Sequence, residues 1–161
     1  MNFKQMFQMQ KELDERIRNE HKLMNVNLID EKILAFQVEL GELANETRCF
    51  KYWSLKQASP KEVILEEYVD GIHFLLSIGI DLQTVDISVE DQENEGNLTK
   101  QFSMIYEQSS QLARTKVKKE FIELFQQYWF LGTLLNFTST EIEAAYIGKN
   151  EVNHQRQNQG Y

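Results

Sequence analysis

Proline occurs only once in the 161 residues, at position 60. A proline inside a helix removes a backbone hydrogen bond and clashes with the preceding turn, so a chain with almost none can carry long helices. The sequence is also rich in Glu, Gln, Lys and Leu, which all favour the helix. Its length is sufficient for one domain with a hydrophobic core. We therefore expect a single all-α domain over residues 1–161, built as a bundle of about six helices.

Charge and cysteine content exclude several classes of protein. The formal net charge is −8, which argues against a dedicated nucleic-acid binder, because such a protein needs clustered Lys and Arg. Cys49 is the only cysteine, so no internal disulfide is possible and a reducing, cytoplasmic location is expected. No apolar signal run follows the N-terminus, and no uncharged apolar stretch reaches about 18 residues, so no membrane association is expected.

Apolar periodicity and capping residues predict where the helices lie. Asp30 is a candidate N-cap, and Ser59, followed by Pro60 and Glu62, has the form of a capping box. The acidic segment 86–97 reads as a solvated connector, with a lid as the alternative. The predicted helices cover residues 2–24, a segment from Asp30, a segment from Ser59 to about Asp81, residues 98–114, residues 116–136, and a short segment from Thr138 to Tyr146.

Two pairs of acids have helical spacing. Glu39 and Glu42 form the first pair, and Glu67 and Asp70 form the second. A helix turns about 100° per residue, so positions i and i+3 share a face. If the two helices lie side by side, four carboxylates converge. Such a cluster needs a hard divalent cation to compensate its charge.

The surroundings of these acids strengthen that interpretation. The helix from Asp30 has apolar residues on more than one side, which predicts that Glu39 and Glu42 are not simple surface charges. The helix from Ser59 is the most apolar of the chain, and Glu66, Glu67, Asp70 and His73 are embedded in it. An unpaired buried carboxylate is so costly that it protonates, so several of them favour a metal site.

Three other segments remain open from the residues alone. Gln10 and Asp14 are four residues apart and could share a pocket, although a solvated helix face is favoured. In the segment from Arg48, Lys51 could contact a phosphate and Trp53 could line a pocket, or both could be structural. The aromatic density of residues 116–136 fits either ordinary core or an oligomer interface.

The C-terminal segment, residues 148–161, is almost entirely polar, a composition typical of a frayed tail. Lys149, Asn150, Asn153 and Arg156 nevertheless fall on one face of a helical turn. They carry donors of the kind that bind phosphate.

Together these stretches resemble the dimeric, all-α dUTPase family, which is related to the MazG-like nucleoside triphosphate pyrophosphohydrolases. The metal motif of that superfamily is E-x-x-E followed by E-x-x-D, and the two acid pairs match it, with residues 43–66 between them. The dUTPase branch is indicated by Lys51-Tyr52-Trp53, by Val69-Asp70-Gly71-Ile72-His73-Phe74, and by Gly148-Lys149-Asn150-x-x-Asn153-x-x-Arg156-Gln157-x-x-Gly160-Tyr161. The chain is shorter than many relatives, so parts of their mobile region are missing here.

The resemblance implies a homodimeric enzyme that converts dUTP and dUDP to dUMP. It implies two or more Mg²⁺ or Mn²⁺ ions held by Glu39, Glu42, Glu67 and Asp70, with Glu42 or Glu39 also activating water at the α-phosphate. Lys149, Asn153 and Arg156 would bind phosphate in the C-terminal segment 148–161, assisted by Lys51 and Tyr161. The base and sugar would contact Gln10, Asp14, Trp53, His73 and Phe74. The family usually carries Asn at the position of Asp14.

Three rival interpretations remain. A MazG-like pyrophosphohydrolase acting on another or non-canonical nucleotide would share the metal motif and differ in base recognition. A carboxylate-bridged di-iron bundle is suggested by Asp70-x-x-His73, but such sites need two Glu-x-x-His repeats. A non-enzymatic acidic helical adaptor would show no effect of Mg²⁺ on its melting temperature.

Overall fold

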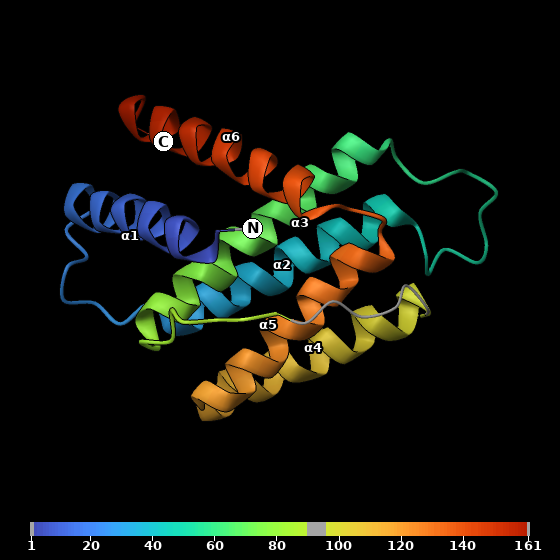
Figure 1. The fold of residues 1–161 in the computed structure, drawn as a ribbon, viewed down its shortest axis with the longest axis horizontal. Helices are drawn as coiled ribbons and strands as arrows, with labels where there is room; N and C mark the ends of the chain where they lie inside the picture. The colour runs from blue at the N-terminus through green and yellow to red at the C-terminus, as the bar shows by residue number, and fades with distance from the viewer. Residues whose placement is uncertain (1, 90–95, 161) are drawn as a thin grey trace.

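The computed structural model describes residues 2–89 and 96–160 (Figure 1). Within these residues all regular structure is helical, which confirms the predicted all-α class. No helix in the described part has the length and apolar composition needed to cross a membrane. The helices are α1 (Phe3–Glu20), α2 (Ile29–Thr47), α3 (Lys61–Asp81), α4 (Leu98–Thr115), α5 (Lys118–Leu134) and α6 (Ser139–Asn158).

Helix α3 is the central element of the bundle. It packs against α1, α2, α5 and α6, while α4 packs against α2 and α5. In Figure 1, α1 and α6 lie together on one side of α3, and the α4–α5 hairpin lies on the other. This position explains why the α3 sequence is so apolar, since most of its faces are covered by other helices.

The crossing of α3 and α5 is built from two tyrosines and two glycines. The rings of Tyr68 and Tyr128 stack with centroids 4.8 Å apart. Each hydroxyl donates to the other residue's carbonyl oxygen, at 3.2 Å from Tyr68 and 2.8 Å from Tyr128. A Cβ at Gly71 would lie 2.1 Å from the Tyr128 hydroxyl, and one at Gly132 would lie 2.5 Å from the Tyr68 hydroxyl. Only glycine permits this close approach.

The aromatic residues of α5 belong to the core of the chain. Phe121, Phe125 and Tyr128 are fully buried, and Trp129 is nearly so. Phe3 of α1 packs edge-on against Phe125 and Trp129. The core interpretation of this segment is therefore confirmed, and its aromatic density gives no argument for an oligomer interface.

Two predicted helix starts are wrong in detail. Asp30 lies in the first turn of α2, whose N-cap is Leu28. Pro60 is the N-cap of α3, and no side chain caps this helix. The Ser59 hydroxyl instead donates to the carboxylate of Glu46, at the end of α2. That contact fixes the connection between α2 and α3, so the residue serves the tertiary structure and not the local helix start.

The last helix starts as predicted but ends much later. Thr138 and Glu141 form the expected capping box. The helix then continues to Asn158, whereas the sequence predicted an end at Tyr146 and a polar tail. Arg16 of α1 accounts for part of this, because its guanidinium donates to the His154 carbonyl at 2.9 Å and to the Asn158 side chain at 2.7 Å. The polar end of α6 is thus held by polar contacts.

The connector after α3 is only partly described. Residues 84–89 and 96–97 have no regular structure, as the sequence predicted for the segment 86–97. Residues 90–95 lie outside the described part of the chain. The structure therefore leaves the choice between connector and lid untested.

Candidate active site

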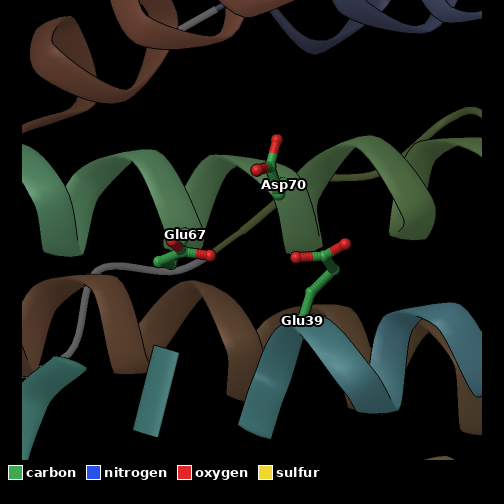
Figure 2. Close-up of side chains that lie close together, drawn as sticks. All are labelled: Glu39, Glu67 and Asp70. Carbon is green, nitrogen blue, oxygen red and sulfur yellow. The ribbon is translucent and has the colours of Figure 1, made fainter. Parts of the chain in front are cut away.

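Three of the four predicted acids meet between α2 and α3. Glu39 extends from α2 toward Glu67 and Asp70 on α3 (Figure 2). One carboxylate oxygen from each lies within 4.8 Å of the others, and all three side chains are partly buried. The i, i+3 spacing on α3 directs Glu67 and Asp70 toward the same region, while Tyr68 and Val69 between them are buried.

Burial and mutual repulsion raise the pKa values of these carboxyls. The pKa of Glu39 rises to about 7, first through burial and then through the charges of Asp70, Glu42 and Glu67. The pKa values of Glu67 and Asp70 are also raised, chiefly by burial, although Lys149 opposes the effect. Three oxygen donors that repel one another at this distance form a suitable ligand set for Mg²⁺ or Mn²⁺. The residues present therefore fit the implied metal.

Glu42 does not join the other three acids. It is exposed, and it lines a second, shallower cavity of about 410 Å³ together with Glu67. The prediction that Glu42 is protected from solvent is wrong, although its charge still acts on Glu39 and Glu67. The reason is that α2 is not covered on every side, since Leu34 is 62% exposed and Val38 is 51% exposed on its open face.

A larger cavity of about 530 Å³ begins beside the three acids. It is enclosed by α1, α2, α3 and α6, so it joins residues from both ends of the chain. Its lining includes nine of the residues singled out from the sequence, namely Gln10, Asp14, Glu39, Asp70, His73, Phe74, Lys149, Asn153 and Arg156. A single cavity therefore contains acids for a metal, cations for phosphate and an aromatic ring for a base.

Lys149 connects the tail helix to the acidic cluster. Its ammonium group lies 2.7 Å from an oxygen of Asp70 and 2.9 Å from one of Glu66. Burial alone would lower the pKa of Lys149, but these two carboxylates raise it. The hydrogen bond from Lys149 in turn lowers the pKa of Glu66, which is exposed. A fixed cation thus borders the cavity next to the predicted metal ligands.

The opposite end of the cavity carries a buried polar network. Asp14 accepts from the side-chain nitrogen of Gln10 at 2.8 Å and from the Lys32 ammonium at 3.2 Å, and it also accepts from the Ser77 hydroxyl. Gln10 also lies 2.8 Å from His73. Burial, together with the charge of Lys149, lowers the pKa of His73 to about 3, so its ring is neutral near pH 7.

The predictions for two residues of the C-terminal segment, Asn150 and Tyr161, are not confirmed by the structure. Asn150 does not face the cavity with Lys149, Asn153 and Arg156, because it is only 3% exposed and lies inside the bundle. The prediction that it shares their phosphate-facing side is therefore wrong. Tyr161 lies outside the described residues, so its predicted role is not tested.

Lys51 and Trp53 lie away from the cavity of their own chain. Helix α2 continues about 12 Å past Glu39 before it ends at Thr47, and the next segment extends outward from the bundle (Figure 1). Trp53 is 64% exposed and contacts Tyr52 and Phe50 edge-on. Lys51 contacts the Asn45 side chain. The structure therefore does not bring Trp53 beside Phe74, where the resemblance expects it.

Lys32 and Ser77 are polar cavity residues whose place in the site was not identified from the sequence. Lys32 lies in the run Asp30-Glu31-Lys32, which reads as solvated charge, yet it pairs with Asp14 and with Asp81 at 2.7 Å. Ser77 follows His73 by one helical turn, and that spacing is the only sequence signal for its place in the site.

The sequence matches the dUTPase family model over residues 2–161. A search among curated proteins found no match. The family match covers the acid cluster, the cavity and the tail helix together, so it agrees with the motifs that indicated this branch. The chain therefore belongs to the dUTPase family and is a hydrolase of the dUTP diphosphatase type.

Proposed function

We propose that the protein hydrolyses dUTP, and also dUDP, to dUMP by attack of water at the α-phosphate. The observation that carries this proposal is the arrangement of one cavity, which has metal-type acids at one end, Lys149 beside them and a network of paired polar and charged side chains at the other. A triphosphate needs charge neutralisation and alignment, while a pyrimidine base needs fixed hydrogen-bonding groups.

Glu39, Glu67 and Asp70 would hold Mg²⁺, and Glu42, next to them on the second cavity, would complete a site for two or more ions. A bound cation would neutralise phosphate charge and activate water. Either Glu39 or Glu42 would accept the proton of that water. Glu39 is the better placed of the two, because it lines the large cavity beside Asp70, whereas Glu42 lies outside that cavity and is exposed.

The remaining cavity residues divide by charge. Lys149, Asn153 and Arg156, in the C-terminal segment 148–161, would contact the phosphate oxygens, with Tyr161 assisting. Phe74 would stack on uracil, and Gln10, Asp14 and His73 would face the base and sugar. Lys149 is paired with Asp70 beside the acid cluster, whereas Lys32 is paired with Asp14 in the polar network, and this difference supports one orientation for the nucleotide.

We also propose a homodimer, in which Lys51 and Trp53 would serve the partner's cavity. The support is that both residues lie outside their own cavity, while the neighbouring Tyr52 and Leu55 are 94% and 98% exposed. A test mixes two inactive variants, Trp53→Ala and Glu67→Gln. Mixed dimers contain one site with neither change, so activity should reappear on mixing. No recovery from a mixture shown to exchange subunits would contradict the shared site.

The function itself is tested by pyrophosphate release from dUTP, dTTP, dCTP and dATP, each measured with Mg²⁺ and with EDTA. We expect metal-dependent turnover of dUTP and little of the others. Glu62→Gln is a matched control for the acid variants, since Glu62 is an exposed acid of α3 outside the cluster. Comparable turnover of all four nucleotides would favour the broader pyrophosphohydrolase function, and no turnover would contradict both.

A further inference from the structure

A chain of three hydrogen-bonded side chains runs from the partly buried Asp14 to the buried His73. The Asp14 carboxylate lies 2.8 Å from the side-chain nitrogen of Gln10, and the Gln10 side-chain oxygen lies 2.8 Å from Nδ1 of His73. Gln10 and His73 are both buried, at 4% and 6% exposure. Hydrogen bonds in such a place must be donated in a consistent direction, because an unmatched donor or acceptor is costly there.

The direction is fixed at Asp14. Its second oxygen accepts from the Lys32 ammonium and the Ser77 hydroxyl, and a carboxylate paired with a lysine has no proton to donate. Gln10 must therefore turn its NH₂ group toward Asp14 and its carbonyl toward His73. A carbonyl only accepts, so the hydrogen of the neutral imidazole must be on Nδ1 of His73.

This leaves the other ring nitrogen of His73 as an acceptor. Nε2 is buried and makes no hydrogen bond of normal geometry among the described residues, although a backbone contact with Tyr146 acts on the ring and opposes the fall of its pKa. His73 is also part of the cavity lining. The low pKa of His73 agrees with a neutral ring that keeps this lone pair free. A buried acceptor without a protein partner in a cavity wall suits a donor that arrives with the ligand.

We propose that Asp14 is a positioning residue that sets the tautomer of His73, so that the cavity presents Nε2 as a hydrogen-bond acceptor to an N–H or O–H group of the nucleoside. The tautomer assignment depends only on the geometry above. The nature of the ligand rests on the proposed function.

The change Asp14→Asn should reverse the direction in which the hydrogen bonds between residue 14, Gln10 and His73 are donated. The ammonium of Lys32 favours the amide oxygen of Asn on its side, which turns the Asn NH₂ group toward Gln10. Gln10 must then rotate its amide, and its NH₂ group donates to Nδ1 of His73. Tyr146 accommodates both directions, since its hydroxyl lies 3.1 Å from both Gln10 and the Met6 carbonyl. The hydrogen on His73 moves to Nε2, and an acceptor becomes a donor.

The test is the ¹⁵N spectrum of histidine-labelled protein near pH 7, with His73 assigned by its loss in His73→Gln. In the wild type we expect Nδ1 to resonate as a protonated nitrogen and Nε2 as an unprotonated one. In Asp14→Asn we expect the opposite assignment, with Nε2 resonating as the protonated nitrogen and Nδ1 as the unprotonated one. Asp81→Asn is the matched control, because Asp81 also pairs with Lys32 and is not in the Asp14–Gln10–His73 chain.

A wild-type ring protonated on Nε2 would overturn the proposal without any variant, so its test does not depend on the folding of Asp14→Asn. An unchanged tautomer in a folded Asp14→Asn protein would overturn it as well. Neither result depends on the protein being active toward dUTP.

The ligand part is tested by kinetics. Asp14→Asn should raise KM for dUTP by roughly tenfold, about the effect of one buried hydrogen bond, with a smaller change in kcat. If the donor is the sugar hydroxyl, the difference in KM should vanish for the 3′-deoxy analogue. If the donor is the N–H group of the base, the difference in KM should vanish for the N3-methyl analogue. A difference that persists with both analogues would overturn the contact with the nucleoside.

Discussion

The two sides of α3 are held by different interactions. Toward α5 the helix presents Tyr68 and Gly71, both buried, and Gly71 lies so close to Tyr128 that a single methyl group is excluded. Toward α1 and α6 it presents Asp70, His73 and Ser77, which contact charged or polar side chains. The two sets alternate between Tyr68 and Ser77, so this part of α3 belongs both to the core and to the site.

This difference shows how the structure separates stability from function. Apolar burial on the α5 side fixes the position of α3, and that position in turn fixes the acids. On the other side, the contacts of α6 include the buried Tyr146 and also the polar contacts of Lys149, which lines the cavity, and of Arg16. Changes on the core side should therefore reduce stability, and changes on the site side should chiefly reduce activity.

The largest expected effect is on activity. Glu67→Gln removes one of the three clustered carboxylates and should lower kcat for dUTP on the order of 100-fold or more. It should not lower the melting temperature, because it also removes repulsion with Asp70 and Glu42. Steady-state kinetics with Mg²⁺ and thermal unfolding in EDTA measure the two quantities, because bound Mg²⁺ would itself stabilise the wild type. A variant that is less stable but retains its kcat would contradict the division between the two sides.

The largest expected effect on stability comes from a methyl group on the core side. Gly71→Ala should reduce the free energy of unfolding by about 1–3 kcal/mol, because its Cβ would collide with the hydroxyl of Tyr128. Gly148→Ala in α6 has free space around it and should increase stability by roughly 0.5–1 kcal/mol. Denaturant unfolding checks both. Equal effects of the two substitutions would show that the close packing of α3 on α5 is unimportant.

A smaller effect concerns pH in EDTA. The folded-state pKa of Glu39 is about 7, above its ordinary value of 4.5, so between these values the folded state binds more protons than the unfolded state. Stability should therefore fall as pH rises from about 4.5 to about 7. Glu39→Gln should flatten the dependence of melting temperature on pH in this window. An identical slope in the variant would exclude Glu39 as its source.

The smallest effect is expected at the end of α6. Arg16→Met should speed hydrogen exchange of the amides of residues 151–158 and raise KM for dUTP a few-fold, with little change in global stability. Lys11→Met is the control, since the only ion pair of Lys11 in the described structure is with Glu15 on its own helix. Unchanged exchange in α6 would mean that Arg16 does not hold the helix.

Much of this arrangement follows from local rules. The i, i+3 spacing placed Glu67 and Asp70 together, and the helical face of the tail placed Lys149, Asn153 and Arg156 on one cavity. Both patterns depend on the geometry of a single helix. The sequence therefore predicted the fold class and half of the residues that line the cavity.

The failures all depend on contacts between segments. Glu42 is exposed because no element covers that side of α2, which the pattern of one helix does not reveal. The length of α6 depends on Arg16, more than a hundred residues away in the chain. Trp53 lies in a segment without regular structure, whose direction no periodicity determines.

The most direct test of the central claim is hydrolysis of dUTP in water enriched in oxygen-18. If the acid cluster and its cation act at the α-phosphate, dUMP should carry one heavy oxygen and the released pyrophosphate none, and EDTA should abolish the reaction. A label in pyrophosphate, release of inorganic phosphate, or turnover that persists in EDTA would contradict it.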